Sequence, residues 1–334
     1  DPYLPHCLGH EGSGVVIETG PGVTKVSVGS EVILSWIKGC GADVPGTTYN
    51  WNGSRVNAGG VTTFSHHAVV SENRVTPLLP GIDFRDAALL GCAVPTGMGA
   101  VCNVAKVQPG ESTVIFGVGG VGLCAVAGAS ISGANPIIAV DIVPDKLHLA
   151  RSLGATHTIN ARDTDPIATV QTILGGLADS AIEATGQTPV MAQALTVVRP
   201  QGGRAVVVGN ASHGEILSID PHELNQGKKL LGTWGGDNNP DQDFPRYANL
   251  MATNRLSLTE LWRVYPLEEV ETALADIEAG RSPDHFSFQT RIYRDEDRTR
   301  LRQHPCPIRR SLSSGGARNR PDSRQCSQPK NRHP

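Results

Sequence analysis

The stretch STVIFGVGGVGLCAVAG, Ser112–Gly128, decides the fold. It combines a β-branched strand, a turn with the spacing Gly117-x-Gly119-x-x-Gly122, and the beginning of a helix. In such a turn the first glycine permits a tight bend, the second lets the backbone approach a pyrophosphate, and the third lets helix and strand pack closely. N–H groups at the start of the helix bind the phosphates. Although glycine turns also arise for steric reasons alone, this context predicts a dinucleotide site.

Strand and helix candidates alternate on the C-terminal side of this stretch. Apolar runs at 136–141, 156–160, 180–186, 204–209 and 229–234 are separated by helical patterns. This alternation predicts a parallel sheet with helices on both faces and right-handed crossovers. With the strand at 112–116 the sheet has six strands, which is a complete dinucleotide-binding sheet.

An acidic residue follows at the spacing that such a site needs. Asp141 ends the second strand, 19 residues after Gly122. A carboxylate about 20 residues after the glycines accepts hydrogen bonds from the adenosine ribose and repels a 2′-phosphate. We therefore expect NAD rather than NADP. The alternative is that Asp141 only caps the helix that opens at Pro144; Lys146 either reaches the ribose or is a solvated lysine.

The residues before the glycine loop have a different pattern. Short β-branched runs at 14–20, 26–36 and 61–71 predict strands of a small β-rich barrel. The segment 39–60 is rich in Gly, Asn, Thr and Pro and is predicted as a long loop. Residues 83–105 have helical spacing interrupted at Pro95 and Gly97, which predicts a helix, an elbow and a second helix.

Two helices are predicted after the sheet, at 243–254 and 266–280. In the second, Val270, Leu274 and Ile277 are spaced by three and four residues and give one apolar face. We expect this face to pack against the β-rich part.

Composition excludes several classes of protein. The chain has 334 residues, of which 39% are hydrophobic and 18% charged, with a net charge of −3. This composition is typical of a two-domain α/β enzyme. No run approaches the roughly 18 apolar residues of a membrane span. The given sequence begins with Asp1, and its first residues lack the basic and apolar segments of a secretory signal. We therefore expect a cytoplasmic location and no membrane partner.

A second motif lies near the beginning of the chain. The spacing Gly9-His10-Glu11-x-x-Gly14, the segment GCAVPTGMGA at 91–100 and the glycine loop together resemble the zinc-containing medium-chain alcohol dehydrogenases over roughly residues 1–280. The resemblance implies a doubly wound Rossmann sheet plus a GroES-like β-barrel catalytic domain. The implied divisions are a catalytic part at 1–107, an NAD-binding part at 108–236, a return segment at 237–280 and a tail at 281–334.

The resemblance also implies a catalytic zinc ion. His10, Cys92 and a cysteine on an upstream segment would hold it, with Glu11 beside it and a water or substrate oxygen in the fourth place. Zinc lowers the pKa of a bound alcohol, which then passes hydride to the nicotinamide. Thr96 and Val121 match positions that border the nicotinamide ring. The expected cofactor-binding residues are Gly117, Gly119, Gly120, Val121, Gly122, Asp141 and Lys146.

The chain departs from this family pattern at three places. The upstream cysteine, expected about twenty residues before His10, has no counterpart here, and Cys7 is a poor substitute. Relatives carry four cysteines for a structural zinc where this chain has only Cys40, so we expect one catalytic zinc and no structural zinc. The tail contains 13 Lys and Arg against 5 Asp and Glu. It is expected to be disordered or translated out of frame, and a nucleic-acid-binding arm is the less favoured alternative.

The predicted function is hydride transfer between a small-molecule alcohol, or its aldehyde or ketone, and NAD. One alternative is an inactive relative that binds NAD without a complete zinc site, since His10 alone is more often an ordinary histidine and Cys92 alone a small buried hydrophobe. A zinc-free quinone-reductase-like enzyme is the other. The strand near residues 228–236 is expected to pair with a second copy in a homodimer or homotetramer. The sequence does not identify the alcohol.

Overall fold

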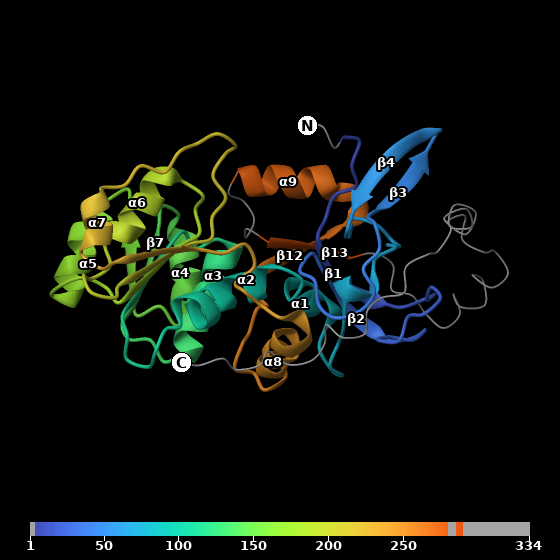
Figure 1. The fold of residues 1–334 in the computed structure, drawn as a ribbon, viewed down its shortest axis with the longest axis horizontal. Helices are drawn as coiled ribbons and strands as arrows, with labels where there is room; N and C mark the ends of the chain where they lie inside the picture. The colour runs from blue at the N-terminus through green and yellow to red at the C-terminus, as the bar shows by residue number, and fades with distance from the viewer. Residues whose placement is uncertain (1–3, 280–284, 290–334) are drawn as a thin grey trace.

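A computed structural model describes residues 4–279 and 285–289. Figure 1 shows two parts side by side, a helix-covered sheet and a β-rich part, with helices of the returning chain (orange) above and below the region between them. Within the described residues no helix is long and apolar enough to cross a membrane.

The larger part is the predicted doubly wound sheet. Its six parallel strands have the order β11-β10-β9-β6-β7-β8, so the order reverses between β6 and β9. Ligands in such sheets bind outside the carboxyl ends of the strands at this reversal. The strands are β6 (Thr113–Phe116), β7 (Ile137–Asp141), β8 (His157–Asn160), β9 (Ser180–Glu183), β10 (Arg204–Val207) and β11 (Lys229–Gly232).

Helices cover both faces of this sheet. Ile115 belongs to one apolar cluster, while its neighbours Val114 and Phe116 belong to the other. Because alternate residues of a strand point to opposite faces, both faces of β6 are buried. The helices of this part are α3 (Gly120–Ile131), α4 (Pro144–Ser152), α5 (Pro166–Leu174), α6 (Thr188–Thr196) and α7 (Pro221–Asn225).

The β-rich part differs from the prediction in detail. It contains the antiparallel sheet β1-β2-β5 and the hairpin β3-β4. The predicted loop at 39–60 was wrong, because Asn52 and Gly53 adopt the positive φ of a hairpin turn. The predicted strand at 61–71 is not formed. The elements are β1 (Glu11–Val15), β2 (Glu31–Ser35), β3 (Thr47–Trp51), β4 (Ser54–Gly59), η1 (Glu72–Arg74) and β5 (Val75–Pro77).

The two parts are joined by the helices α1 (Phe84–Leu89) and α2 (Ala93–Gly99) and by the π-helical turn η2 (Ala100–Ala105). The elbow predicted at Pro95 and Gly97 instead lies before Ala93, between α1 and α2. Pro95 is in the first turn of α2, where a missing N–H costs little. Gly97 lies where a Cβ would overlap the Val121 carbonyl oxygen, so this glycine serves the close approach of α2 and α3.

The chain then returns to the β-rich part through α8 (Pro240–Ala252), β12 (Trp262–Pro266), η3 (Leu267–Glu269) and α9 (Val270–Glu278). The indole of Trp262 donates to Asp86 of α1 at 2.8 Å, which fixes this return. The apolar face predicted for α9 is only partly correct, since Ala273 is fully buried but Leu274 is 40% exposed.

The last described element is β13 (His285–Gln289), which pairs in parallel with β12. The disorder expected of the tail therefore does not hold for these five residues. The remaining tail predictions, including the out-of-frame and nucleic-acid hypotheses, fall on residues 280–284 and 290–334, outside the described residues.

Candidate active site

The glycine loop lies at the carboxyl end of β6. Gly117 has a φ of 78°, which favours glycine. A Cβ on Gly122 would overlap the Gly117 carbonyl oxygen, so strand and helix come together here only without side chains. Gly119 is the N-cap of α3, whose first residues are Gly120 and Val121. The loop thus offers the N-terminus of a twelve-residue helix at the strand-order reversal, as a dinucleotide pyrophosphate requires.

The Asp141 carboxylate is tied to this loop. Its Oδ2 accepts from the Val118 N–H at 2.8 Å, and its Oδ1 accepts from the N–H groups of Ile142 and Val143. Val143 is the N-cap of α4, and no side chain caps that helix. Asp141 thus accepts from the glycine loop as well as from the N-cap residue of the helix that opens at Pro144. Lys146 lies half-buried on α4.

The second cluster forms where α2 begins. Cys92 is the N-cap of α2, and its Sγ lies 3.2 Å from the indole Nε1 of Trp36 and 3.9 Å from Thr96 Oγ1. Glu11, the first residue of β1, accepts from the Ala93 N–H at 3.2 Å. The structure thus brings Glu11, Cys92 and Thr96 together. Burial first, and then the charge of Glu11, raise the pKa of the Cys92 thiol to about 12.

His10 is less firmly placed in this cluster. It directly precedes β1, and its side chain is exposed. Among the described residues no group of three or more His, Cys, Asp or Glu side chains is arranged to hold a metal ion. The donor types nevertheless fit zinc, because a thiol with an N–H donor on its sulfur lies beside a carboxylate, and an imidazole is adjacent in sequence.

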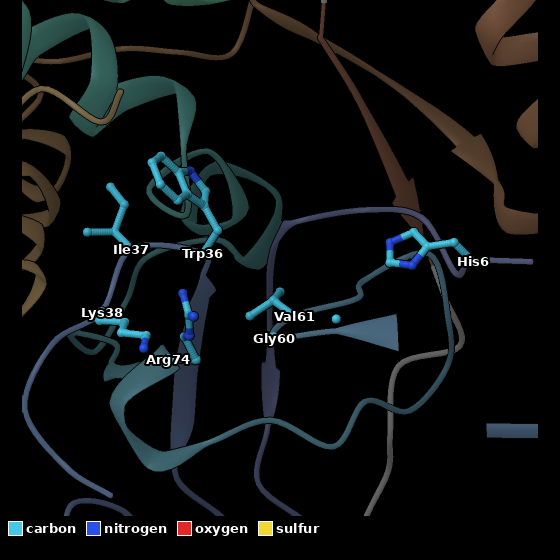
Figure 2. A pocket seen from close by; sticks show the side chains of 8 residues that line it. His6, Trp36, Ile37, Lys38, Gly60, Val61 and Arg74 are labelled. Carbon is cyan, nitrogen blue, oxygen red and sulfur yellow. The ribbon is translucent and has the colours of Figure 1, made fainter. Parts of the chain in front are cut away.

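A cavity of about 560 Å³ opens beside this cluster (Figure 2). Its walls are Trp36, Ile37 and Lys38 after β2, Gly59, Gly60 and Val61 at the end of β4, Arg74 of η1 and His6. Trp36 is shared, since it lines the cavity and also hydrogen-bonds to Cys92. Trp36 therefore contacts both the cavity and the candidate metal ligand.

Sequence reasoning missed three residues of this region. Trp36 and Arg74 lie in the cavity wall, and no local pattern marks either. Glu183 ends β9 and is fully buried, and its Oε1 accepts from the N–H groups of Thr185 and Gly186. A single charge at the end of the apolar run 180–183 was a signal that could have identified Glu183.

Comparison with known proteins agrees with this geometry. The model of the alcohol dehydrogenase GroES-like domain matches residues 1–80, and that of the zinc-binding dehydrogenases matches residues 120–253. S-(hydroxymethyl)glutathione dehydrogenase of Synechocystis sp. is 38% identical over 261 residues, which cover 70% of this chain and 71% of the relative. The enzyme of the same name from Escherichia coli O6:H1 is 37% identical over 262 residues, with the same coverage of both chains.

Solved structures show the same fold. The benzyl alcohol dehydrogenase of Acinetobacter calcoaceticus superposes with a TM-score of 0.78 at 31% identity and covers 86% of this chain and 85% of its own. An alcohol dehydrogenase zinc-binding domain protein of Burkholderia ambifaria gives 0.75 at 32% identity, with the same coverage. With the doubly wound sheet, the GroES-like part and the glycine loop, these matches show that the chain belongs to the zinc-containing medium-chain alcohol dehydrogenase family.

Proposed function

We propose that this chain is an NAD-dependent alcohol dehydrogenase of the zinc type that interconverts a small-molecule alcohol and its aldehyde or ketone. The observation that carries the proposal is the packing of α2 on α3. Gly97 of α2 approaches the Val121 carbonyl of α3 too closely for any side chain. Since Thr96 is adjacent to Gly97 and Cys92 is the N-cap of the same helix, this contact supports a site in which the thiol and the dinucleotide lie close together.

His10, Glu11 and Cys92 are the residues that would hold one catalytic zinc ion. Bound zinc would supply Lewis-acid activation of the alcohol, and bound NAD would supply the acceptor for the hydride of the carbinol carbon, with release of the hydroxyl proton. The chain's own part is to position these groups. Trp36 donates to the Cys92 sulfur and orients it, and the Ala93 N–H holds the Glu11 carboxylate. We propose no structural zinc, because residues 39–60 contain one cysteine.

The coenzyme would lie along the glycine loop. The α3 N-terminus would face the pyrophosphate, and Asp141, which accepts from the Val118 N–H, would also accept from the adenosine ribose. Lys146 would approach the same ribose from α4. Thr96 and Val121 would border the nicotinamide.

The expected assembly is a homodimer or homotetramer through β11. This strand is at the edge of the six-stranded sheet, and Trp234, just after it, is 80% exposed. An unpaired edge beside a large exposed aromatic favours pairing with a second copy. Light scattering during gel filtration measures the number of copies directly.

The proposed activity is tested by metal analysis together with kinetics. We expect one zinc per chain and NADH formation that depends on added alcohol. Cys92→Ser should lose both, whereas Cys102→Ser, a half-buried free thiol outside the cluster, serves as the matched control. NAD binding without zinc or turnover would instead identify the inactive relative.

A further inference from the structure

The loop that connects β11 to α8, residues 233–239, lies with its backbone directly against α2. A Cβ on Gly99 of α2 would come within 2.2 Å of the Gly236 carbonyl oxygen, and a Cβ on Gly236 would come within 2.4 Å of the Pro95 carbonyl oxygen. Gly236 also has a φ of 69°, which favours glycine. Because the two backbones touch, a shift of the loop must move the helix.

Asn238 joins the two backbones at this contact. Its Nδ2 donates to the carbonyl oxygens of Pro95 and Gly235, at 2.6 and 2.5 Å. Its Oδ1 accepts from the Tyr247 hydroxyl at 2.7 Å and, less closely, from the Asn103 Nδ2 at 3.4 Å. Two donated and two accepted hydrogen bonds are the full capacity of an asparagine amide. An aspartate of the same shape would have no proton to give to either carbonyl oxygen.

The other side of the loop packs on Trp36. A Cβ on Gly235 would lie 3.2 Å from Cζ2 and 3.3 Å from Cη2 of the indole, and 3.1 Å from Cδ1 of Ile37. Figure 2 shows the Trp36 and Ile37 side chains next to each other. The same indole donates from its Nε1 to the Cys92 Sγ at 3.2 Å. Gly235, held by Asn238, therefore limits where the indole can lie, and the indole limits where the sulfur can lie.

The Cys92 thiol is thus held from two directions, and both depend on Asn238. Cys92 is the N-cap of α2, and Pro95 lies in the first turn of that helix. The bond to the Pro95 carbonyl therefore fixes the beginning of the helix that carries the thiol. The bond to the Gly235 carbonyl fixes the surface on which the Trp36 indole rests. Since the hydrogen bonds of the Asn238 amide are all made within the protein, its role is to hold other groups in place.

We propose that Asn238 is a positioning residue for the catalytic metal site. Through two backbone carbonyl oxygens it holds the Cys92 sulfur against the Trp36 indole. This inference rests on the proposed function, since Cys92 is the thiol ligand of the proposed zinc site. Groups that orient a metal ligand contribute about 10- to 100-fold to metal affinity. Loss of the Asn238 donors should therefore release the sulfur and weaken zinc binding.

The first test measures zinc affinity by chelator competition. Asn238→Asp loses both donors, and its affinity should fall about 10-fold or more. Tyr247→Phe removes only the hydroxyl that donates to the Asn238 Oδ1 and should show a smaller fall, which keeps the test available if Asn238→Asp does not fold. Asn239→Ala is the matched control, because it removes the N-cap of α8 and leaves both carbonyl contacts. Wild-type affinity in Asn238→Asp and Tyr247→Phe, or an equal fall in Asn239→Ala, overturns the proposal.

A labelling test separates this proposal from the proposed function, because it needs neither zinc nor coenzyme. Iodoacetamide is added to the metal-free chain, and modification of Cys92 and Cys7 is followed by mass spectrometry of peptides. Cys7, a half-buried free thiol outside α2, serves as the internal standard. In Asn238→Asp the rate at Cys92 relative to Cys7 should rise at least about fivefold as the sulfur leaves the indole.

The labelling result has two informative outcomes besides the expected one. An unchanged ratio of the two rates overturns the positioning role, even in a chain that oxidises alcohols. A raised ratio in a chain that oxidises no alcohol supports the role of Asn238 in holding the sulfur and rejects the dehydrogenase activity.

Discussion

Glu72→Gln should destabilise the β-rich part strongly, although Glu72 takes no part in chemistry. The Glu72 Oε1 accepts from the N–H groups of Thr24 and Lys25 at 2.6 and 2.7 Å, and Oε2 accepts from the Ala42 N–H at 2.8 Å. A glutamine retains one acceptor oxygen and turns its NH₂ toward a donor. One unsatisfied buried N–H costs about 1–3 kcal/mol, and two weakened charge-assisted bonds cost about 1 kcal/mol each. We expect a loss of about 3–5 kcal/mol in the free energy of unfolding.

The loss of stability in Glu72→Gln should depend on pH in a predictable direction. Burial alone raises the pKa of Glu72, but donation by Ala42, Thr24 and Lys25 outweighs burial, so the pKa lies below its ordinary value of 4.5. A carboxyl with a depressed folded-state pKa stabilises the fold above its unfolded pKa, and this contribution is lost as the pH falls through the folded-state pKa. The difference between wild type and Glu72→Gln should therefore be largest near neutral pH and shrink below pH 4.5.

Urea denaturation followed by tryptophan fluorescence measures this difference, because Trp36 and Trp51 both lie in the β-rich part. Glu31→Gln is the matched control, since Glu31 is an exposed residue of β2 and should change stability by less than about 0.5 kcal/mol. A difference below about 1 kcal/mol for Glu72→Gln, or one that persists unchanged in acid, would refute the role of the three N–H donors.

Three further substitutions test the site. Gly122→Ala places a Cβ on the Gly117 carbonyl oxygen, so we expect NADH binding, measured by fluorescence titration, to be lost; wild-type affinity would show that the loop is not the coenzyme site. Trp36→Phe keeps an aromatic wall but removes the donor to Cys92, and zinc affinity in a chelator competition should fall about 10-fold or more. Asp141→Asn removes the charge that repels a 2′-phosphate, so the NAD over NADP preference in kcat/KM should drop at least about tenfold, and an unaltered preference would contradict this role.

The dinucleotide part was predictable because its information is local. Strand, turn and helix follow one another within Ser112–Gly128. The glycine spacing indicates the positions at which the backbones of strand and helix approach each other closely. The six strands of the sheet were each predicted to within a few residues at their beginnings. The β-rich part was harder to predict, because its strands are short and half-exposed. There the Asn52-Gly53 turn, rather than hydrophobic alternation, determines the hairpin.

The cavity could not be predicted in the same way, because it is assembled from four separate stretches of chain. His6 precedes β1, Trp36 follows β2, Gly60 follows β4 and Arg74 ends η1. No periodicity in any one stretch shows that the four meet. In addition, the prediction of a loop at 39–60 missed β4, the strand that leads into Gly60 beside Arg74.

The burial of the Arg74 guanidinium could not be predicted from the sequence either. A guanidinium nitrogen held out of water without a partner costs free energy of folding, so packing does not account for Arg74 and a sequence argument based on stability would place an apolar residue there. Glu72, two residues earlier, is fully satisfied by backbone donors and holds η1 in place. Of the two charged residues of η1, Glu72 thus fixes the backbone through these three bonds, whereas the Arg74 Nε is buried without a hydrogen-bond partner.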